Sequence, residues 1–422
     1  MEFKAIAGMW AVSGSKASMN MVSAIVLALL APLLLVNLVF VAEMTFGLGR
    51  GRRRQWQAPA GRTTIIVPAH DEERLIGHTI AALTAAGSAH FPILVVADNC
   101  TDDTAAIARG YPVAVIERHD PTHRGKGHAL AFARDFLRKD PPDTVIVLDA
   151  DCRINKESLE ALASACKQLR RPAQAIYLLE PSLLSGPLVQ LSCFAFLIKN
   201  LVRQRGLQRL AGTVHLTGTG MSLPWALFDG ADLATSSIVE DLRLGIELGQ
   251  GGAHPFLVEG SIVWSAHAEQ SNTLDQRSRW EGGFLALARA TAPGLIVRGV
   301  QGLSPRTILA GLDLLVPPLA LLALVNGGTF LVLTALAATN ATSWSPPLIL
   351  GSIGVVAAMV LLLAWWREGR QFLSPASLAR LPLYVLWKIP MYLKLARSGA
   401  PKVWQRTERP DKTGRGAAPP SD

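Results

Sequence analysis

The stretch that decides the fold is VIVLDAD, residues 145–151, in which an apolar run ends in two carboxylates, Asp149 and Asp151. An apolar run of this length is typical of a buried β-strand, and the carboxyl end of such a strand is where α/β sheets hold ligands. Paired carboxylate oxygens at this place suit Mg²⁺ or Mn²⁺ bound to a diphosphate. By itself, the pattern also fits a phosphatase of the Asp-x-Asp type or an exposed acidic turn.

Similar apolar runs continue on both sides of this stretch, between Arg62 and Pro181. Amphipathic stretches separate them, and the clearest cover residues 126–137 and 156–169. This alternation predicts an α/β fold with a mainly parallel sheet, helices on both faces and a nucleotide-sized crevice at the switch point of the sheet. The further apolar runs lie at residues 64–67, 93–96, 113–116 and 175–178.

Two long stretches without a charged side chain flank this region, at residues 17–42 and 314–366. Because a membrane-crossing helix needs about 20 apolar residues, we expect one span at about 21–42 and a hairpin of two spans at about 308–338 and 347–366. A cleaved signal peptide is the alternative for the first stretch. Its apolar run is longer than the usual signal-peptide core of about 7–15 residues, which favours a retained anchor.

Basic residues predict the orientation in the membrane. Four arginines lie within residues 50–54, and the region after Trp366 carries eleven Lys or Arg against four acids. Such clusters beside spans face the cytoplasm, so we expect an inner (cell) membrane protein with several spans and a cytoplasmic central domain. The basic tail lacks a nucleic-acid motif, and anionic lipid is therefore the expected partner rather than nucleic acid. The expected domains are an N-terminal region with one span (residues 1–49), a cytoplasmic catalytic domain (50–305), a transmembrane hairpin (306–370), and a basic interfacial segment with a cytoplasmic tail (371–422).

The sequence does not decide how two segments are placed relative to the core and the membrane. Residues 186–210 are apolar and end in arginines, a pattern that fits either a buried core helix or a basic amphipathic helix at the membrane surface. Residues 381–395 interleave apolar side chains with two lysines and two prolines, and they are short for a span, which favours an interfacial segment.

Taken in order, the motifs of the central domain resemble those of the family 2 glycosyltransferases, in particular the membrane-embedded branch that includes cellulose and hyaluronan synthases. VPAHDEE at residues 67–73 is similar to the family's first-strand motif, and VVADNCTDDT at 95–104 is similar to its second. RGKGHAL at 124–130 and the Asp-x-Asp pair complete the donor side. The resemblance implies a GT-A fold and a nucleotide-sugar site formed by Pro68, Ala69, Glu72, Asp98, Lys126 and Asp149, with a metal on Asp149 and Asp151.

The sequence departs from the family pattern at two places. Ala97 replaces the first acid of the usual pair, and His70-Asp71 replaces Tyr-Asn. These changes bear on which nucleotide is bound more than on the fold.

The acceptor side of the resemblance rests on Asp241 and on QRSRW, residues 276–280, which begins 35 residues later. On a helix, Gln276 lies three and four residues from Arg279 and Trp280, so all three can face one pocket. The resemblance implies that Asp241 is the catalytic base, that Arg279 pairs with the diphosphate and that Trp280 is a platform for the acceptor sugar. Helix capping is the alternative for the acidic pair at 240–241.

Together these features predict an inverting, metal-dependent transfer from a nucleotide diphosphate sugar, with a UDP-sugar favoured, to a polysaccharide or lipid-linked saccharide acceptor at the cytoplasmic face of the membrane. Mg²⁺ or Mn²⁺ is the expected cofactor, membrane lipids are expected partners, and an export or assembly partner would fit the small number of spans. A catalytically silent subunit of a polysaccharide assembly complex is the alternative. The donor sugar, the linkage and processivity do not follow from the sequence.

Overall fold

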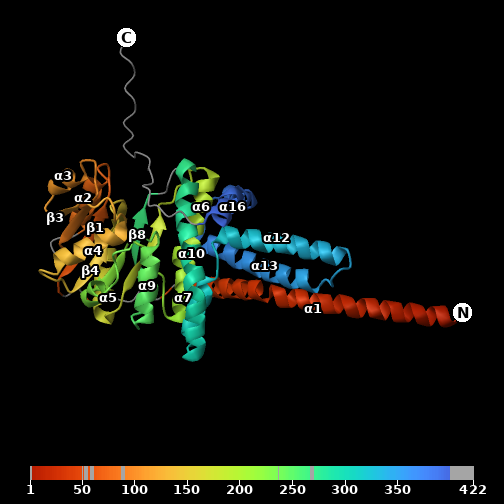
Figure 1. The fold of residues 1–422 in the computed structure, drawn as a ribbon. Helices are drawn as coiled ribbons and strands as arrows, with labels where there is room; N and C mark the ends of the chain where they lie inside the picture. Colours follow the sequence, from red (N-terminus) through yellow and green to blue (C-terminus); the bar gives the residue numbers. More distant parts are fainter. Residues whose placement is uncertain are drawn as a thin grey trace, which may run out of the picture.

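The computed structural model describes residues 2–49, 51, 56–57, 61–86, 91–235, 237–266 and 270–399 (Figure 1). Most of the arginine cluster at residues 50–54 and the tail beyond residue 399 therefore lie outside the described residues.

The central domain is built on one eight-stranded sheet in the order β3-β2-β1-β4-β7-β6-β8-β5. The pairs β1–β2, β1–β4, β2–β3 and β6–β8 are parallel, whereas β4–β7, β6–β7 and β5–β8 are antiparallel. The predicted α/β fold with a mostly parallel sheet is thus confirmed. The strands are β1 (Thr63–Ala69), β2 (Ile93–Asp98), β3 (Ala114–Arg118), β4 (Thr144–Val147), β5 (Cys152–Ile154), β6 (Ala173–Leu179), β7 (Met221–Pro224) and β8 (Phe256–Ser265).

Helices cover both faces of the sheet because successive strand residues point to opposite faces. Ile65 of β1 belongs to one buried apolar cluster with α2 and α5, whereas its neighbour Ile66 belongs to a second cluster with α4. The helices of this domain are α2 (Ile76–Ala85), α3 (Thr104–Arg109), α4 (Lys126–Leu137), α5 (Lys156–Leu169), α8 (Trp225–Asp229) and α9 (Glu240–Gln250). The bounds of α4 and α5 coincide with the amphipathic stretches recognised in the sequence.

Within the described residues, four helical segments could cross a membrane by length and composition: Met19–Gly47, Arg277–Gln301, Leu319–Ala338 and Ser345–Gly369. They belong to α1 (Glu2–Gly47), α10 (Gln270–Gln301), α12 (Leu319–Ala338) and α13 (Ser345–Ala364) with η3 (Trp365–Gly369). The segment in α10 was not among the expected spans. Figure 1 shows α1, α12 and α13 extending together away from the sheet, whereas α10 runs across their base.

The first helix of the expected hairpin begins later than residue 308. A separate helix, α11 (Pro305–Leu314), ends before Pro317-Pro318, and α12 begins at Leu319. Proline lacks an amide hydrogen and disfavours helical backbone in the residue before it, so the pair separates the two helices.

A layer of helices joins the sheet to the apolar helices. One continuous helical stretch consists of α6 (Pro187–Leu197), the π-helical turn η2 (Ile198–Arg203) and α7 (Gln204–Ala211). Its backbone meets that of α1 closely, since a Cβ atom at Gly206 would lie 2.0 Å from the carbonyl oxygen of Glu43. Glycine is therefore required at this crossing. The layer is completed by α14 (Pro375–Leu378), α15 (Leu381–Trp387) and α16 (Ile389–Ser398).

The structure gives different answers for residues 186–210 and 381–395, the two segments whose placement the sequence left open. Two arginines of the stretch 187–211 are bound inside the protein: Arg203 pairs with Glu43 and Asp313, and Arg205 with Glu259 and Glu368. The third, Arg209, is exposed and donates to the backbone carbonyls of Phe46 and Gly49. This stretch is therefore a buried core helix rather than a helix that offers its arginines to lipid. The segment 381–395 forms parts of two short helices, neither of which is long enough to cross a bilayer.

Candidate active site

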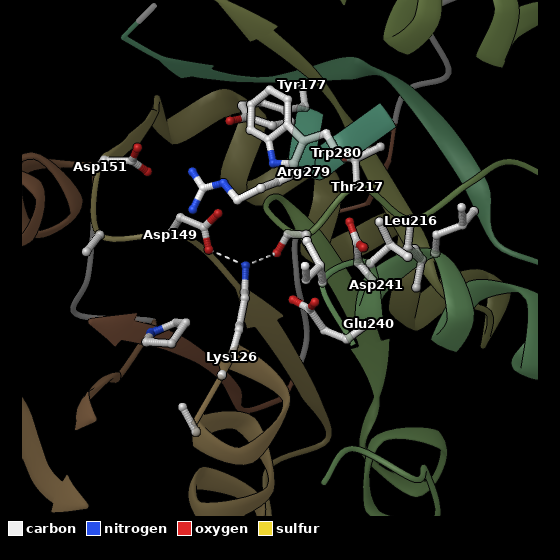
Figure 2. Close-up of a pocket in the computed structure, with 18 of the residues that line it drawn as sticks. Lys126, Asp149, Asp151, Tyr177, Leu216, Thr217, Glu240, Asp241, Arg279 and Trp280 are labelled. Carbon is white, nitrogen blue, oxygen red and sulfur yellow. Dashed lines mark hydrogen bonds and ion pairs between the residues drawn. The ribbon is translucent and has the colours of Figure 1, made fainter. Parts of the chain in front are cut away.

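A pocket with a volume of about 300 Å³ lies at the carboxyl ends of β1, β2 and β4. This volume is at the lower end of the range of small-molecule sites, about 300–1,000 Å³. We call it the polar pocket (Figure 2). The sequence-predicted residues that line it are Pro68, Ala69, Glu72, Asp98, Lys126, Asp149, Asp151, Asp241, Arg279 and Trp280.

Lys126 lies at the centre of the donor side of this pocket. Its ammonium group donates to a carboxylate oxygen of Asp149 and, over 2.6 Å, to the carbonyl oxygen of Gly218. Burial opposes its charge, but the carboxylates of Asp149, Glu240 and Asp241 raise the pKa of Lys126 above its ordinary value. The side chain is therefore a fixed positive charge between the two acidic pairs of the pocket.

Asp149 and Asp151 form the candidate metal site. One carboxylate oxygen of each, together with the sulfur of Cys152, lies within 4.8 Å of the others. Burial raises the pKa of the Cys152 thiol to about 12, so the sulfur stays protonated and is a poor ligand. The two carboxylates remain, and hard oxygen donors of this kind fit Mg²⁺ or Mn²⁺.

A second acidic pair lies across the pocket at the first turn of α9. Burial raises the pKa of Glu240 to about 8, and the neighbouring Asp241 adds to this shift. Burial also raises the pKa of Asp241 above its ordinary value, although Lys126 and Lys199 oppose the shift. No side chain caps this helix at its N-cap residue, Val239. The acids thus face the pocket and do not serve as the N-cap.

The loop at Gly218 brings the two acidic pairs close to Lys126. Gly218 has a φ of +83°, and a Cβ atom there would lie 3.2 Å from a carboxylate oxygen of Asp241 and 3.5 Å from the nitrogen of Lys126. Any larger residue would be strained in this conformation and would crowd both groups. The hydroxyl of Thr219 accepts a hydrogen bond from the amide of Asp149, which ties the same loop to the candidate metal site.

Asp98, an expected residue of the nucleotide-sugar site, is largely enclosed. Its side chain is 9% exposed, and one of its oxygens accepts from Arg118 over 2.7 Å and from Asn99 over 3.1 Å. The ring of His70 is hydrogen-bonded to the backbone carbonyl of Asp98 over 2.7 Å. These contacts hold the end of β2 rigidly at the wall of the polar pocket.

The helix α10 brings Arg279 and Trp280 to the other side of the pocket. Figure 2 shows the guanidinium of Arg279 directed toward the side of Asp149. The residue between Gln276 and this pair, Arg277, points elsewhere: it is 6% exposed, it donates to the hydroxyl and carbonyl of Ser192, and its guanidinium lies 5.5 Å from the ring of Trp280. Arg277 therefore supports the position of Trp280. Gln276 belongs to α10, but its side chain lies outside the described residues.

Several pocket residues were not assigned from the sequence. Tyr177 comes from the end of β6, His215 and Thr217 from the loop before β7, and Lys199 from the π-helical turn η2. Of these residues, Lys199 could have been recognised in the sequence, because it is the single lysine within the apolar segment from Leu188 to Leu201. The other side chains have no distinctive neighbours in the sequence, and only the fold brings them to the pocket.

Comparisons with known proteins agree with this geometry. The profile of the family described as Glycosyltransferase like family 2 matches residues 59–283, just over half of the chain. A 4,4'-diaponeurosporenoate glycosyltransferase from Staphylococcus aureus (strain USA300) is 35% identical over 101 residues, which are 20% of this chain and 27% of that protein. The match thus spans about a quarter of the relative's length.

Among solved structures, the mannosyltransferase PcManGT from Pyrobaculum calidifontis, in complex with GDP-Man and Mn²⁺, is similar with a TM-score of 0.52. The likeness covers 87% of this chain and 99% of that chain at 18% identity, and it concerns the fold. The matched residues 59–283 contain the sheet, both acidic pairs and the residues Arg279 and Trp280. The chain is a transferase that belongs to the family described as Glycosyltransferase like family 2.

Proposed function

We propose that this protein is an inverting glycosyltransferase that moves a sugar from a nucleotide diphosphate sugar to a membrane-bound acceptor and requires Mg²⁺ or Mn²⁺. The observation that carries the proposal is the placement of two acidic pairs in one pocket, with Lys126 between them. One pair has the donor set of a metal site, and the other contains a carboxylate whose pKa is displaced toward neutrality.

Asp241 suits the role of the base. An inverting transfer needs a base at the acceptor hydroxyl, on the side of the sugar opposite the leaving diphosphate. A carboxylate whose pKa is raised by burial is a stronger base than an exposed aspartate. In the proposed step, Asp241 removes the proton of the acceptor hydroxyl while the acceptor oxygen bonds to the sugar carbon and the bond to the diphosphate breaks.

The donor side would be held by Asp149, Asp151, Lys126 and Arg279. A divalent ion on the two carboxylates supplies positive charge that balances the charge developing on the diphosphate. Lys126 already contacts Asp149, and its fixed charge would bind a phosphate oxygen. Arg279 is suited to forked contacts with the diphosphate. Pro68, Ala69, Glu72 and Asp98 form the wall against which the nucleoside would lie.

The known complexes of similar proteins support this donor class. PcManGT, which has the same fold, binds GDP-Man and Mn²⁺. The donor base of this protein is an open choice between uridine, which the sequence motifs favour, and guanosine. A panel of donors with both bases therefore belongs in any assay.

We further infer that the protein belongs to a membrane-embedded branch of the family, as cellulose and hyaluronan synthases do, and that its sheet domain faces the cytoplasm. The arrangement of α1, α12 and α13 supports three spans, and α10, which crosses their base, would then lie along the membrane surface (Figure 1). In this arrangement the polar pocket sits next to the membrane. The acceptor would be a polysaccharide or a lipid-linked saccharide, with an export or assembly partner if a polymer leaves the cell.

The test is release of nucleoside diphosphate by the purified full-length protein, with Mg²⁺ or Mn²⁺, across a panel of UDP- and GDP-sugars. Release that depends on one donor and on the metal is the expected result. Asp241→Asn should lower transfer by about 100-fold or more, because general-base catalysis contributes about 10²–10⁴-fold, while donor binding stays close to that of wild type.

Asp135→Asn is the matched control, since Asp135 lies on the exposed side of α4 with a side-chain exposure of 56%. Full transfer by Asp241→Asn would disprove the base assignment. Lack of diphosphate release with every donor would leave a silent subunit as the better description.

A further inference from the structure

A second cavity, with a volume of about 130 Å³, adjoins the polar pocket on its membrane side. Five residues line both spaces: Phe196, Lys199, His215, Trp280 and Phe284. The two spaces thus share a boundary at Trp280, the side chain that faces the acceptor side of the polar pocket. We call the second space the apolar cavity.

The walls of the apolar cavity come from the buried stretch α6-η2-α7 and from helices that could cross a membrane. Phe40 belongs to α1, Ala320 and Ala323 to α12, and Leu361 to α13. The short helix α15 adds Leu381 and Val385, and the break at Pro317-Pro318 forms another part of the wall. A molecule in this cavity is therefore surrounded by apolar helices and lies within reach of the polar pocket.

The charged side chains around the apolar cavity are almost all bound to other protein groups. Arg203 pairs with Glu43 and Asp313, and Lys388 pairs with Glu281. Arg277 donates to Ser192, as described above. A ligand here meets apolar surface and neutralised ion pairs, which favours a neutral apolar molecule over an anionic one.

Lys199 differs from these charged side chains, because it lies at the boundary between the two spaces. It forms no hydrogen bond or ion pair with any residue that the structure describes, and its ammonium group lies 5.8 Å from the centre of the Phe284 ring. Lys199 lies at the shared boundary, where its charge acts on Asp241. Its charge is thus directed to the reacting groups of the polar pocket and does not mark a separate anion site deep in the cavity.

We propose that the apolar cavity admits the end of a neutral membrane lipid, and that a hydroxyl group of this lipid itself is the acceptor of the sugar. This inference rests on the proposed function and narrows its acceptor from polysaccharide to lipid. A cavity of this size takes only the end of such a lipid, and the remainder would extend between the helices into the bilayer. Mostly apolar walls favour a lipid, which loses water favourably on entering the cavity, over a sugar chain, whose many hydroxyl groups would lose hydrogen bonds to water.

The proposed step is balanced within the polar pocket. The lipid hydroxyl enters past Trp280, and its proton goes to Asp241. The lipid oxygen bonds to the anomeric carbon of the sugar, and the nucleoside diphosphate leaves with the electron pair of the broken bond.

The experiment uses the full-length protein in an alkyl dimethylamine oxide detergent, which has no hydroxyl group to compete. A labelled donor and metal are supplied with one of four acceptors: dodecanol, dodecyl phosphate, a soluble maltooligosaccharide, or the neutral-lipid fraction of the membranes that contain the protein. Label is then measured in the organic and aqueous phases. We expect organic-phase product with dodecanol or with the neutral-lipid fraction.

Ala323→Phe is the decisive variant, because it fills the apolar cavity without touching the polar pocket. It should raise the KM for the lipid acceptor by about tenfold or more, because the added ring takes up space in the apolar cavity, and leave slow transfer of the sugar to water unchanged. Ala335→Phe is the control, since Ala335 is an exposed residue of the same helix and does not line the apolar cavity.

Four results would overturn the inference. Labelled product could form only with dodecyl phosphate, or only in the aqueous phase with the oligosaccharide, or with none of the four acceptors. The fourth result is an unchanged KM for the lipid acceptor in Ala323→Phe. In all four cases the proposed function can still hold, because metal-dependent diphosphate release reports on it separately. If no nucleoside diphosphate is released with any donor, not even by transfer of the sugar to water, the proposed function itself fails.

Discussion

The polar pocket and the apolar cavity lie side by side, and their charged side chains are arranged differently. In the polar pocket, the acids at 149, 151, 240 and 241 face one another with Lys126 among them, and the pKa values of several are displaced. Around the apolar cavity, the acids Glu43, Glu281 and Asp313 are each bound by a cation. Charges in the first region are arranged for ligands, whereas those in the second hold helices together.

The cluster around Arg203 shows the structural use of charge. Arg203 joins Glu43 of α1 to Asp313 of α11, and the side chains of the two acids are 1% and 3% exposed. Despite the burial of Asp313, His215 and Arg203 hold its pKa below the ordinary value. The cluster therefore links an apolar helix, the π-helical turn and the region next to the polar pocket through ion pairs.

The largest expected effect follows from removing Arg203. Arg203→Met should lower the free energy of unfolding by about 3–5 kcal/mol, because it leaves Glu43 buried without this cation and Asp313 with His215 as its remaining partner. Thermal unfolding in detergent measures this change. The control is Arg138→Met, whose exposed pair with Asp229 is worth at most about 1 kcal/mol. Equal stability of Arg203→Met and wild type would mean that water reaches this cluster, and the contrast between the two regions would disappear.

The second prediction concerns the donor side of the polar pocket. Asp149→Asn should lower metal-dependent diphosphate release by about 100-fold or more, because the ion loses a charged ligand and several kcal/mol of charge stabilisation. Stability should change little, since this acid is arranged for a ligand. Release is measured during a titration with Mn²⁺, beside Asp135→Asn. An unchanged response to Mn²⁺ would remove Asp149 from the metal site.

The smallest expected effect concerns Glu240 in the absence of donor and metal. Its pKa is about 8 in the folded protein and about 4.5 when exposed, so the folded state keeps a proton that the unfolded chain releases. Stability contributed by this group is complete below pH 4.5 and is lost as the pH rises through about 8. Glu240→Gln cannot lose a proton, and its melting temperature should exceed that of wild type at pH 8.5 but not at pH 4.5.

Glu247→Gln provides the control for this pH dependence. Glu247 lies on the same helix, is 41% exposed and pairs with Arg243 at the surface. Its substitution should leave the difference from wild type nearly constant between the two pH values. A constant difference for Glu240→Gln as well would contradict the displaced pKa and with it the electrostatic character assigned to the polar pocket.

The strands that could be predicted are those with continuous apolar runs. β1, β2, β4 and β6 are buried on both faces, and β3 lies beside them at the edge, so their composition reveals them. The strands β5, β7 and β8 were not predicted. β5 and β7 have three and four residues, and β8 contains Glu259 and Gly260 in its middle. Their pairing depends on neighbours that are distant in the sequence, which a local pattern does not report.

The amino-acid sequence by itself determined the α/β class and three of the four described helical segments that could cross a membrane, because apolar runs have a local physical signature. Its motifs also identified ten of the residues that line the polar pocket. Only the tertiary structure decided that Arg277 supports Trp280, that Arg203 and Arg205 are held in ion pairs, and that an apolar cavity joins the polar pocket. These features arise from contacts between residues far apart in the sequence, such as the ion pair of Arg205 with Glu368, 163 positions away. Packing of distant helices creates them, and no local pattern of residues encodes that packing.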